Sequence, residues 1–353
     1  MKRILQILFC VLFFGTCLFF SLGMMIPGAS EAAEGDVTMP SLMKDGSPNE
    51  DFADEFEDYF TKSFAYRSYV VDAYASLKVG LFGEGNDQVI VGRDDFLFFA
   101  ETLDDYVGKN KMTDEEINAA ADSLLAFYEY ARARGTGFLF LCAPNKNHVY
   151  GEYMPARYVA DDQPTDLDRL YAALDERGVP YADLRTPLAD GKAEALLYHK
   201  RDTHWNGQGA RVAYETTADA LGFPSLDFDS LTAVESDTFE GDLDTLLFPG
   251  RTMYDDDSTY DFDGLFVYTS AYSTPMDMQI TTRGGGSGKL LMFRDSFANA
   301  LIPLFASSFA ECRFERAIPF RADLLESYSA DYMIIEIAER NIHNLIGADE
   351  RIK

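Results

Sequence analysis

The chain has 353 residues, of which 47% are hydrophobic and 14% are aromatic, and its formal net charge is -29. This apolar content suffices for a packed core, so the composition excludes a chain that is disordered throughout. The acidic excess argues against nucleic acid as a partner, because phosphate contacts need lysine and arginine, and equally against docking onto anionic lipid. The length allows one large domain or two small ones, with an appendage.

The N-terminus carries the basic residues Lys2 and Arg3, followed by an uncharged apolar run from Ile4 to Ile26. At about 23 residues this run exceeds the roughly 20 that a helix needs to cross a bilayer. We expect an uncleaved signal-anchor helix over residues 1–30. Cleavage at the small residues 28–30 and a buried core helix are the alternatives. By the positive-inside rule the basic end stays in the cytoplasm and the body of the protein lies outside it.

Residues 31–85 connect this helix to the main body. The first part, up to Glu50, is small, polar and acidic, which is typical of a linker. From Asp51 to Phe82, apolar residues recur at spacings of three and four, which predicts one or two amphipathic helices. We expect these helices to pack on the body, residues 86–353.

The main body alternates strand-like and helix-like segments. A capping box from Thr113 to Glu116 begins one helix, and Gly135 ends it. The pattern predicts a hairpin over 88–99, helices over 167–176, 187–197 and 207–221, and strands over 137–142, 179–184, 265–270, 278–282, 289–293, 312–314 and 332–337. This alternation indicates an α/β fold with a mostly parallel sheet flanked by helices.

Residues 235–264 interrupt the alternation with an irregular, acidic stretch that includes three consecutive aspartates from Asp255. A calcium loop would need regularly spaced oxygen ligands and a distal glutamate, and that spacing is absent. We therefore expect a solvated loop here rather than a metal site.

The four cysteines give no sign of a metal or redox centre. Cys10 and Cys17 fall inside the N-terminal apolar run, and Cys142 and Cys312 lie at the ends of apolar runs in the body. We expect the last two to be free, buried thiols, although the sequence leaves their pairing open. No Cys-x-x-Cys occurs, so neither a structural zinc site nor a thioredoxin-like site is indicated, and we predict no cofactor.

Three residues in two motifs are candidates for a site of nucleophilic catalysis. Asp202 precedes His204 by two positions, in a loop that leads into a helix, and Ser296 follows the apolar strand 289–293. A serine hydroxyl needs a base to take its proton, histidine titrates in the right range, and a carboxylate fixes the histidine tautomer. Open α/β sheets place their sites at such strand ends. Taken singly, Ser296 is also compatible with a helix cap, and His204 with a structural histidine.

Two further residues are candidates for contacts to substrate or to a developing oxyanion. The N–H of Ser296 lies at a predicted helix N-terminus, and Asn299, one turn on, offers a side-chain donor. Lys146 follows the strand that begins at Gly137, where it either binds an anionic sugar, lines the cleft or caps a helix.

These motifs resemble those of a known family. Asp202-Thr203-His204-Trp205-Asn206 and Asp295-Ser296-Phe297 are similar to the paired motifs of the alginate O-acetyltransferase group, which includes AlgJ and AlgX, and of the bacterial DHHW proteins. The resemblance covers nearly the whole part after the N-terminal helix, including residues 58–67, 91–98, 144–146, 296–300 and 339–340.

The resemblance implies an SGNH-hydrolase-like fold in which the Asp-x-His motif precedes the serine, a permuted order. It implies Ser296 as nucleophile, His204 as base and Asp202 as the residue that orients it. It also implies transfer of an acetyl group, without a cofactor, onto a hydroxyl of a secreted or cell-surface polysaccharide. A membrane-bound O-acyltransferase commonly helps to supply the acetyl group in this family.

The sequence departs from the family pattern at two positions and leaves two other functions open. Arg294 stands where ordinary SGNH enzymes have glycine, and Thr203 replaces the first inner histidine of the DHHW motif. One alternative is a carbohydrate acetyl esterase with the same three residues and water as acceptor. The other is a non-catalytic polysaccharide-binding protein, favoured if Ser296 and His204 lie beyond about 4 Å of each other.

Overall fold

A computed structural model describes residues 2–23, 38–44, 46–316, 318–349 and 352. The chain forms two compact units. The smaller comprises residues 1–86 and 244–252, and the larger comprises residues 87–243 and 253–353. Every residue singled out above as a candidate site residue lies in the larger unit.

The smaller unit begins with α1 (Lys2–Gly23), whose segment Arg3–Phe20 is long and apolar enough to cross a membrane. Such a helix near the N-terminus fits a signal-anchor or a signal peptide. The alternative cleavage site at residues 28–30 lies outside the described residues. The remaining elements of this unit are β1 (Met43–Lys44), β2 (Ser47–Pro48), α2 (Phe52–Ser63) and α3 (Arg67–Phe82).

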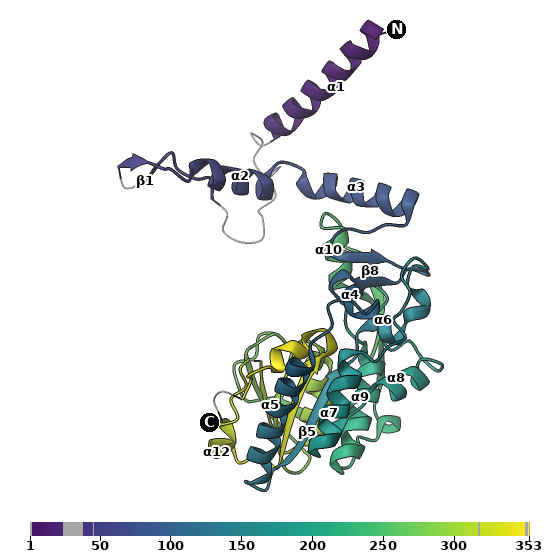
Figure 1. The fold of residues 1–353 in the computed structure, drawn as a ribbon, viewed down its shortest axis with the longest axis vertical. Helices are drawn as coiled ribbons and strands as arrows, with labels where there is room; N and C mark the ends of the chain where they lie inside the picture. Colours follow the sequence, from purple (N-terminus) through teal and green to yellow (C-terminus); the bar gives the residue numbers. More distant parts are fainter. Residues whose placement is uncertain (1, 24–37, 45, 317, 350–351, 353) are drawn as a thin grey trace. The chain divides into compact units, whose positions relative to one another are not determined.

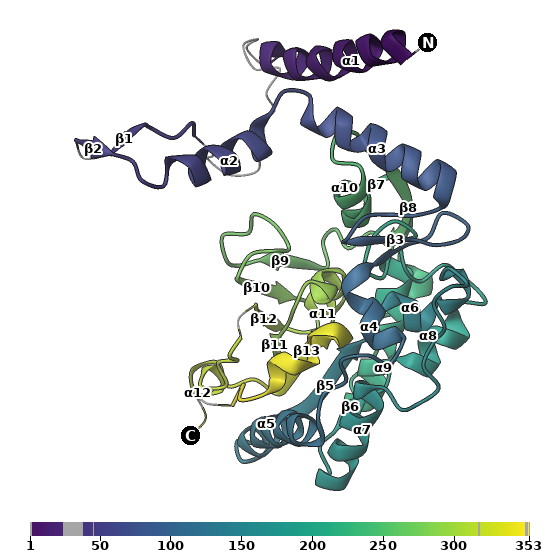
Figure 2. The same ribbon diagram turned by 45° about the horizontal axis from the view of Figure 1, so that its top comes forward.

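The larger unit is built on a seven-stranded sheet with the order β6-β5-β13-β11-β12-β10-β9, which Figure 2 shows fanning out from β9 to β6. Adjacent strands are parallel from β6 to β12, whereas β10 pairs antiparallel with both β12 and β9. The mostly parallel α/β sheet is thereby confirmed. The strands are β5 (Gly137–Ala143), β6 (Tyr181–Ala182), β9 (Phe266–Tyr268), β10 (Gln279–Gly284), β11 (Lys289–Phe293), β12 (Glu311–Glu315) and β13 (Tyr332–Ala338).

Helices cover both faces of this sheet, with a hydrophobic core on each side. Along β11, Leu290 and Met292 belong to one core while Leu291 and Phe293 belong to the other, as the two-residue period of a strand requires. One face carries α5 (Asp114–Arg132) and α7 (Asp166–Arg177), which pack side by side (Figure 1), with α12 (Leu324–Tyr328) and η5 (Glu339–Leu345). The other face carries α6 (Lys146–Val149), α8 (Arg185–Gly191), α9 (Gly207–Leu221), η4 (Phe297–Leu301) and α11 (Ile302–Ser308).

Local sequence signals explain where several helices begin. The predicted capping box forms: the Thr113 side chain accepts the Glu116 N–H, and the Glu116 carboxylate accepts the Thr113 N–H. The side chain of Asn206 caps α9, which spans 207–221 as predicted. A Cβ on Gly207 would lie 2.3 Å from the Ser258 carbonyl oxygen, so this glycine lets another strand, β8 (Tyr254–Tyr260), pack directly on the start of α9.

The acidic stretch 235–264 is not the solvated loop that we expected. It contains most of β7 (Ala233–Glu240), α10 (Asp242–Leu247) and β8 (Tyr254–Tyr260), and β7 pairs antiparallel with β8. Aspartate disfavours strands, but here backbone pairing and contact with α9 override that tendency. The predicted helix 187–197 is also shorter than expected, because α8 ends at Gly191.

Shorter elements complete the larger unit. The predicted hairpin forms from β3 (Val89–Val91) and β4 (Leu97–Phe99), and short helical turns are η1 (Ala100–Thr102), α4 (Leu103–Tyr106), η2 (Gly151–Tyr153) and η3 (Phe228–Ser230). Cys142 on β5 and Cys312 on β12 are both buried and free, which confirms the expected thiols.

Candidate active site

Asp202 and His204 lie on the loop that leads into α9. The backbones of Tyr198 and Trp205 form an isolated antiparallel bridge that closes this loop. The Trp205 indole N–H donates to the carbonyl oxygen of Phe297 at 2.9 Å, which ties the loop to the segment after Ser296. The only tryptophan of the chain is therefore a structural link between the two motifs.

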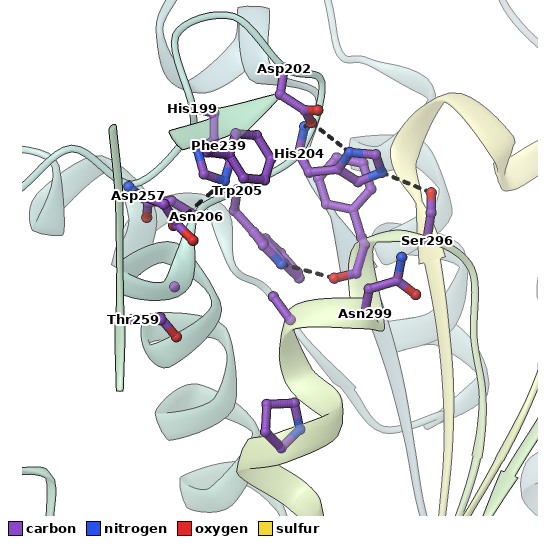
Figure 3. A pocket seen from close by; sticks show the side chains of 14 residues that line it. His199, Asp202, His204, Trp205, Asn206, Phe239, Asp257, Thr259, Ser296 and Asn299 are labelled. Atoms are coloured by element: carbon purple, nitrogen blue, oxygen red, sulfur yellow. Dashed lines mark hydrogen bonds and ion pairs between the residues drawn. The ribbon is translucent and has the colours of Figure 1, made fainter. Parts of the chain in front are cut away.

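A continuous chain of hydrogen bonds joins the three predicted residues (Figure 3). Nε2 of His204 lies 2.8 Å from Oγ of Ser296, and Nδ1 of His204 lies 2.7 Å from Oδ1 of Asp202. Both distances fall in the range at which a base can take a hydroxyl proton and a carboxylate can orient the base. The separation of His204 and Ser296 is well below the 4 Å limit set above for a working pair.

Asp202 is held as a buried carboxylate. Its side chain is 6% exposed, and burial alone would raise its pKa. The hydrogen bonds from His204 and from the backbone N–H of Asp242 outweigh burial and hold the pKa of Asp202 well below its usual value. The carboxylate therefore stays ionised and can stabilise a positive charge on the imidazole.

Asp242 is a site residue that the sequence did not reveal. Its carboxylate accepts the backbone N–H of Thr203 at 2.8 Å and the Thr203 hydroxyl at 2.6 Å, while its own N–H donates to Asp202. Burial, followed by the nearby charge of Asp202, raises the pKa of Asp242. Asp242 and Thr203 thus brace the loop between the two predicted residues. The signal was hidden because Asp242 lies in the acidic stretch, among many aspartates.

Ser296 sits in a tight turn between β11 and η4, at the carboxyl end of the parallel strand. Asp295 shapes this turn, because its carboxylate accepts the N–H groups of Phe297 and Ala338 at 2.9 and 2.7 Å. The backbone N–H of Asp295 in turn donates to the buried Glu336. In the described part of the chain the Ser296 N–H has no hydrogen-bond acceptor, so it is available to a ligand.

Asn299 lines the same pocket, and Arg294 sets the orientation of its amide. Arg294 is 3% exposed, and its Nη1 donates to Oδ1 of Asn299 at 2.6 Å. Its Nη2 donates to two backbone carbonyl oxygens in residues 275–277. The Asn299 oxygen is therefore engaged, and its Nδ2, which meets only the weak acceptor Met276 Sδ at 3.3 Å, lies on the side of Ser296 in Figure 3.

Of the roles that the sequence left open for Lys146, contact with a sugar and a place in the cleft wall do not agree with its position in the structure. It is 5% exposed, and its Nζ donates to the carbonyl oxygens of His199, Lys200 and Asp202 at 3.0, 3.0 and 2.6 Å. Burial lowers the pKa of Lys146 to about 7. Its ammonium thus holds the loop that carries Asp202, and it does not line the pocket.

The pocket beside Ser296 has a cavity volume of about 270 Å³. Besides the predicted residues, its wall includes five that sequence reasoning missed: Pro303, His199, Phe239, Asp257 and Thr259. The last three come from β7 and β8, so the strand pair that replaces the expected loop forms one side of the site (Figure 3). Phe239 stacks on His199 with ring centroids 3.7 Å apart.

Two groups of side chains bring possible metal ligands together in the described part of the chain. One is Asp202, His204 and Asp242, and the other is Asp105, His148 and Glu339. In the first group both ring nitrogens of His204 already contact Asp202 and Ser296. This arrangement suits proton transfer, because each nitrogen has a defined partner.

Comparison with known proteins confirms the family resemblance. Residues 89–253 match the family described as an SGNH hydrolase-like domain of the acetyltransferase AlgX. The matched residues include Asp202 and His204 and end before Ser296. A curated relative, "Probable alginate O-acetylase AlgJ" from Pseudomonas putida, is 26% identical over 229 residues, which cover 64% of this chain and 56% of the relative. The chain therefore spans little more than half of that relative's length.

Solved structures share the fold. A DHHW family protein from Eubacterium siraeum superposes with a TM-score of 0.58 at 15% identity, covering 75% of this chain and 96% of that chain. Bacillus cereus PatB1 superposes with a TM-score of 0.55 at 15% identity, covering 73% of this chain and 97% of that chain. Together with the match of residues 89–253 to the SGNH hydrolase-like domain, these superpositions support the SGNH-hydrolase-like fold that the resemblance implied.

Proposed function

We propose that this protein is an O-acetyltransferase that modifies a hydroxyl of a cell-surface or secreted polysaccharide through an acetyl-serine intermediate. The observation that carries the proposal is the hydrogen-bond chain from Asp202 through His204 to Ser296, which opens into a pocket. The AlgX-type domain and the relatives named alginate O-acetylase support acetyl transfer over other chemistry of the same three residues.

The first half-reaction loads the enzyme. Nε2 of His204 takes the proton from Oγ of Ser296 as that oxygen attacks the acetyl carbonyl, and Asp202 stabilises the imidazolium. The tetrahedral intermediate collapses when the bond to the donor's leaving oxygen breaks. That oxygen takes the proton back from His204, which leaves acetyl-Ser296 and a neutral imidazole.

The second half-reaction transfers the acetyl group. His204 takes the proton from a sugar hydroxyl, whose oxygen attacks the acetyl-Ser296 carbonyl. The intermediate expels Oγ of Ser296, which regains its proton from His204. In both steps the Ser296 N–H and the Asn299 amide are the donors for the negative oxygen, because the first has no acceptor in the described residues and Arg294 holds the second.

The same proposal assigns a location and a partner. α1 anchors the protein in the membrane, with the catalytic unit outside the cytoplasm, as its apolar length and the basic residues at its N-terminal end suggest. An acetyl donor on that side must be delivered across the membrane, and we assign this step to a membrane-bound O-acyltransferase. The esterase alternative differs only in the acceptor, which would be water.

Acylation of the full-length chain in detergent tests the assignment. After incubation with an activated acetyl ester, intact-mass spectrometry should detect one added acetyl group, which peptide mapping places on Ser296. The rate of ester turnover should fall about 10⁴-fold in the Ser296→Ala and His204→Ala variants. Ser287→Ala, which removes an exposed serine, is the matched control and should acylate normally. Undiminished ester turnover by folded Ser296→Ala would sink the proposal.

A second readout separates the transferase from the esterase. When a carbohydrate acceptor is added to the acetylated enzyme, transfer yields an O-acetylated sugar, whereas hydrolysis yields only acetate. A sugar product that rises with acceptor concentration supports the transferase. Acetate alone, at a rate independent of every sugar tested, supports the esterase.

A further inference from the structure

The described wall of the pocket contains carboxylates but no permanently charged basic side chain. Among the described residues that line the pocket, none is lysine or arginine, whereas two are aspartates, Asp202 and Asp257. Asp202 is paired with His204. The charge of Asp257 is therefore the one that an entering ligand meets without a protein counter-ion at the pocket wall.

Among the described residues, no lysine or arginine forms an ion pair with Asp257. Its buried Oδ1 has no hydrogen-bond partner in the described residues, and the nearest cation candidate is Nε2 of His199 at 3.7 Å. Burial lowers the pKa of His199, which disfavours the charged form of this ring. Two buried cationic side chains outside the pocket wall bond other groups: Lys146 bonds backbone carbonyls, and Arg294 bonds Asn299 and the 275–277 segment.

The rest of this wall is apolar or hydroxyl-bearing. Phe239 presents an aromatic ring that His199 backs, Pro303 and Ala300 add aliphatic surface, and Thr259 adds a hydroxyl. In Figure 3, Asp257 and Thr259 lie on the side of the pocket opposite Ser296. A sugar ring offers hydroxyl donors to a carboxylate and a C–H face to an aromatic ring, so an uncharged sugar matches both features.

A uronic acid does not match them. Its carboxylate has the same charge as Asp257 and offers no hydrogen-bond donor. Burial of the two carboxylates side by side is therefore unfavourable, because no hydrogen bond between them offsets the repulsion. The net charge of -29 adds a long-range repulsion to the local one. Alginate, which appears in the names of the curated relatives, is a polymer of uronic acids and is therefore a poor match for this pocket.

We propose that the acceptor of this protein is a sugar without a carboxylate, and that Asp257 and Phe239 on the β7–β8 pair select it. The inference rests on the proposed acetyl transfer and adds the class of its acceptor. Asp257 accepts hydroxyl donors of the uncharged sugar and excludes uronates by like charge, while Phe239 supports the ring.

Two matched small acceptors test this directly. Full-length protein in detergent is acetylated with an activated ester, freed of excess ester, and mixed with methyl glucoside or methyl glucuronide at equal concentration. The loss of acetyl from Ser296 is followed by intact mass. We expect about a tenfold faster discharge by the glucoside. This ratio follows from the repulsion between Asp257 and the glucuronide carboxylate, taken as two unit charges about 6 Å apart at an effective dielectric constant of about 40.

Neighbouring aspartates supply the variants. Asp257→Asn should bring the ratio of the two rates toward one. Asp256→Asn makes the same charge change on an exposed side chain outside the pocket lining and should keep the preference. Phe239→Ala should slow the discharge of acetyl-Ser296 by methyl glucoside and leave the discharge by methyl glucuronide unchanged. Equal discharge by both sugars, discharge by neither, or the same response in both aspartate variants would overturn the inference.

The same experiment keeps this inference separate from the function it rests on. If the activated ester leaves no acetyl group on Ser296, the proposed enzyme is wrong and the acceptor comparison never begins. If acetyl-Ser296 forms but the glucuronide discharges it as fast as the glucoside, the enzyme stands and the acceptor class falls.

Discussion

Replacing Lys146 with methionine should impair a reaction that Lys146 does not touch. Methionine retains an apolar side chain but removes the ammonium, which binds three backbone carbonyl oxygens and lies over the rings of Phe96 and Phe98. Each buried acceptor left without a donor costs roughly 1–3 kcal/mol, so the loop loses at least about 3 kcal/mol of support. Removal of a buried charge, whose pKa burial lowers to about 7, offsets part of this loss.

We therefore expect a net fall of about 2 kcal/mol in the free energy of unfolding, measured by urea denaturation. Because the freed loop carries Asp202, acylation of Ser296 by an activated ester should slow at least about tenfold in protein that is still folded. Lys200→Met is the control. The Lys200 ammonium lies over the Phe96 ring, and among the described residues it does not bond the backbone carbonyls of the loop that carries Asp202. Normal acylation in folded Lys146→Met would refute the reasoning.

Two further predictions concern Arg294 and His148. Arg294→Met frees the Asn299 amide and should slow acylation about tenfold. The double variant with Asn299→Ala should be no slower than Asn299→Ala alone, and additive losses would contradict this coupling. Burial would lower the pKa of His148, but Glu339, 2.9 Å from Nδ1, raises it to about 9 from the usual 6.5. This pair stabilises fully below pH 6.5 and loses about 3 kcal/mol as the pH rises through about 9. His148→Gln should flatten urea-derived stability over that window, and an unchanged slope would show that the pair is not ionised.

The sequence predicted most of the fold because its signals are local. Continuous apolar runs indicated the buried strands β5, β11 and β13, and the capping residues Thr113 and Asn206 marked where helices begin. Parallel strands bring their carboxyl ends to one edge, so motifs that follow different strands are expected to approach each other. Because of that rule, Asp202, His204 and Ser296 can be grouped from the amino-acid sequence alone.

The remaining residues of the site could not be found in this way, because their roles depend on burial and pairing. β8 contains three consecutive aspartates, which no strand propensity favours, and only its pairing with β7 makes it a strand. Asp242 and Asp257 are ordinary members of an acidic segment until the fold places them beside the site. For Lys146, the sequence showed a charge near a strand end but not that backbone carbonyls surround it.

The residues that the sequence revealed and those that it did not have different proposed roles in the site. In the proposed mechanism, Asp202, His204 and Ser296 act on any hydroxyl that reaches the acetyl group, so they indicate the reaction class and say nothing about the acceptor. The choice among water, a neutral sugar and a uronate depends on what the pocket wall excludes and stabilises. In this protein that wall is the β7–β8 pair, with Phe239 and Asp257 facing the nucleophile's pocket. Substitutions in residues 233–260 should therefore change the preferred acceptor. Formation of acetyl-Ser296 should instead depend on Asp202, His204 and the loop that Lys146 holds.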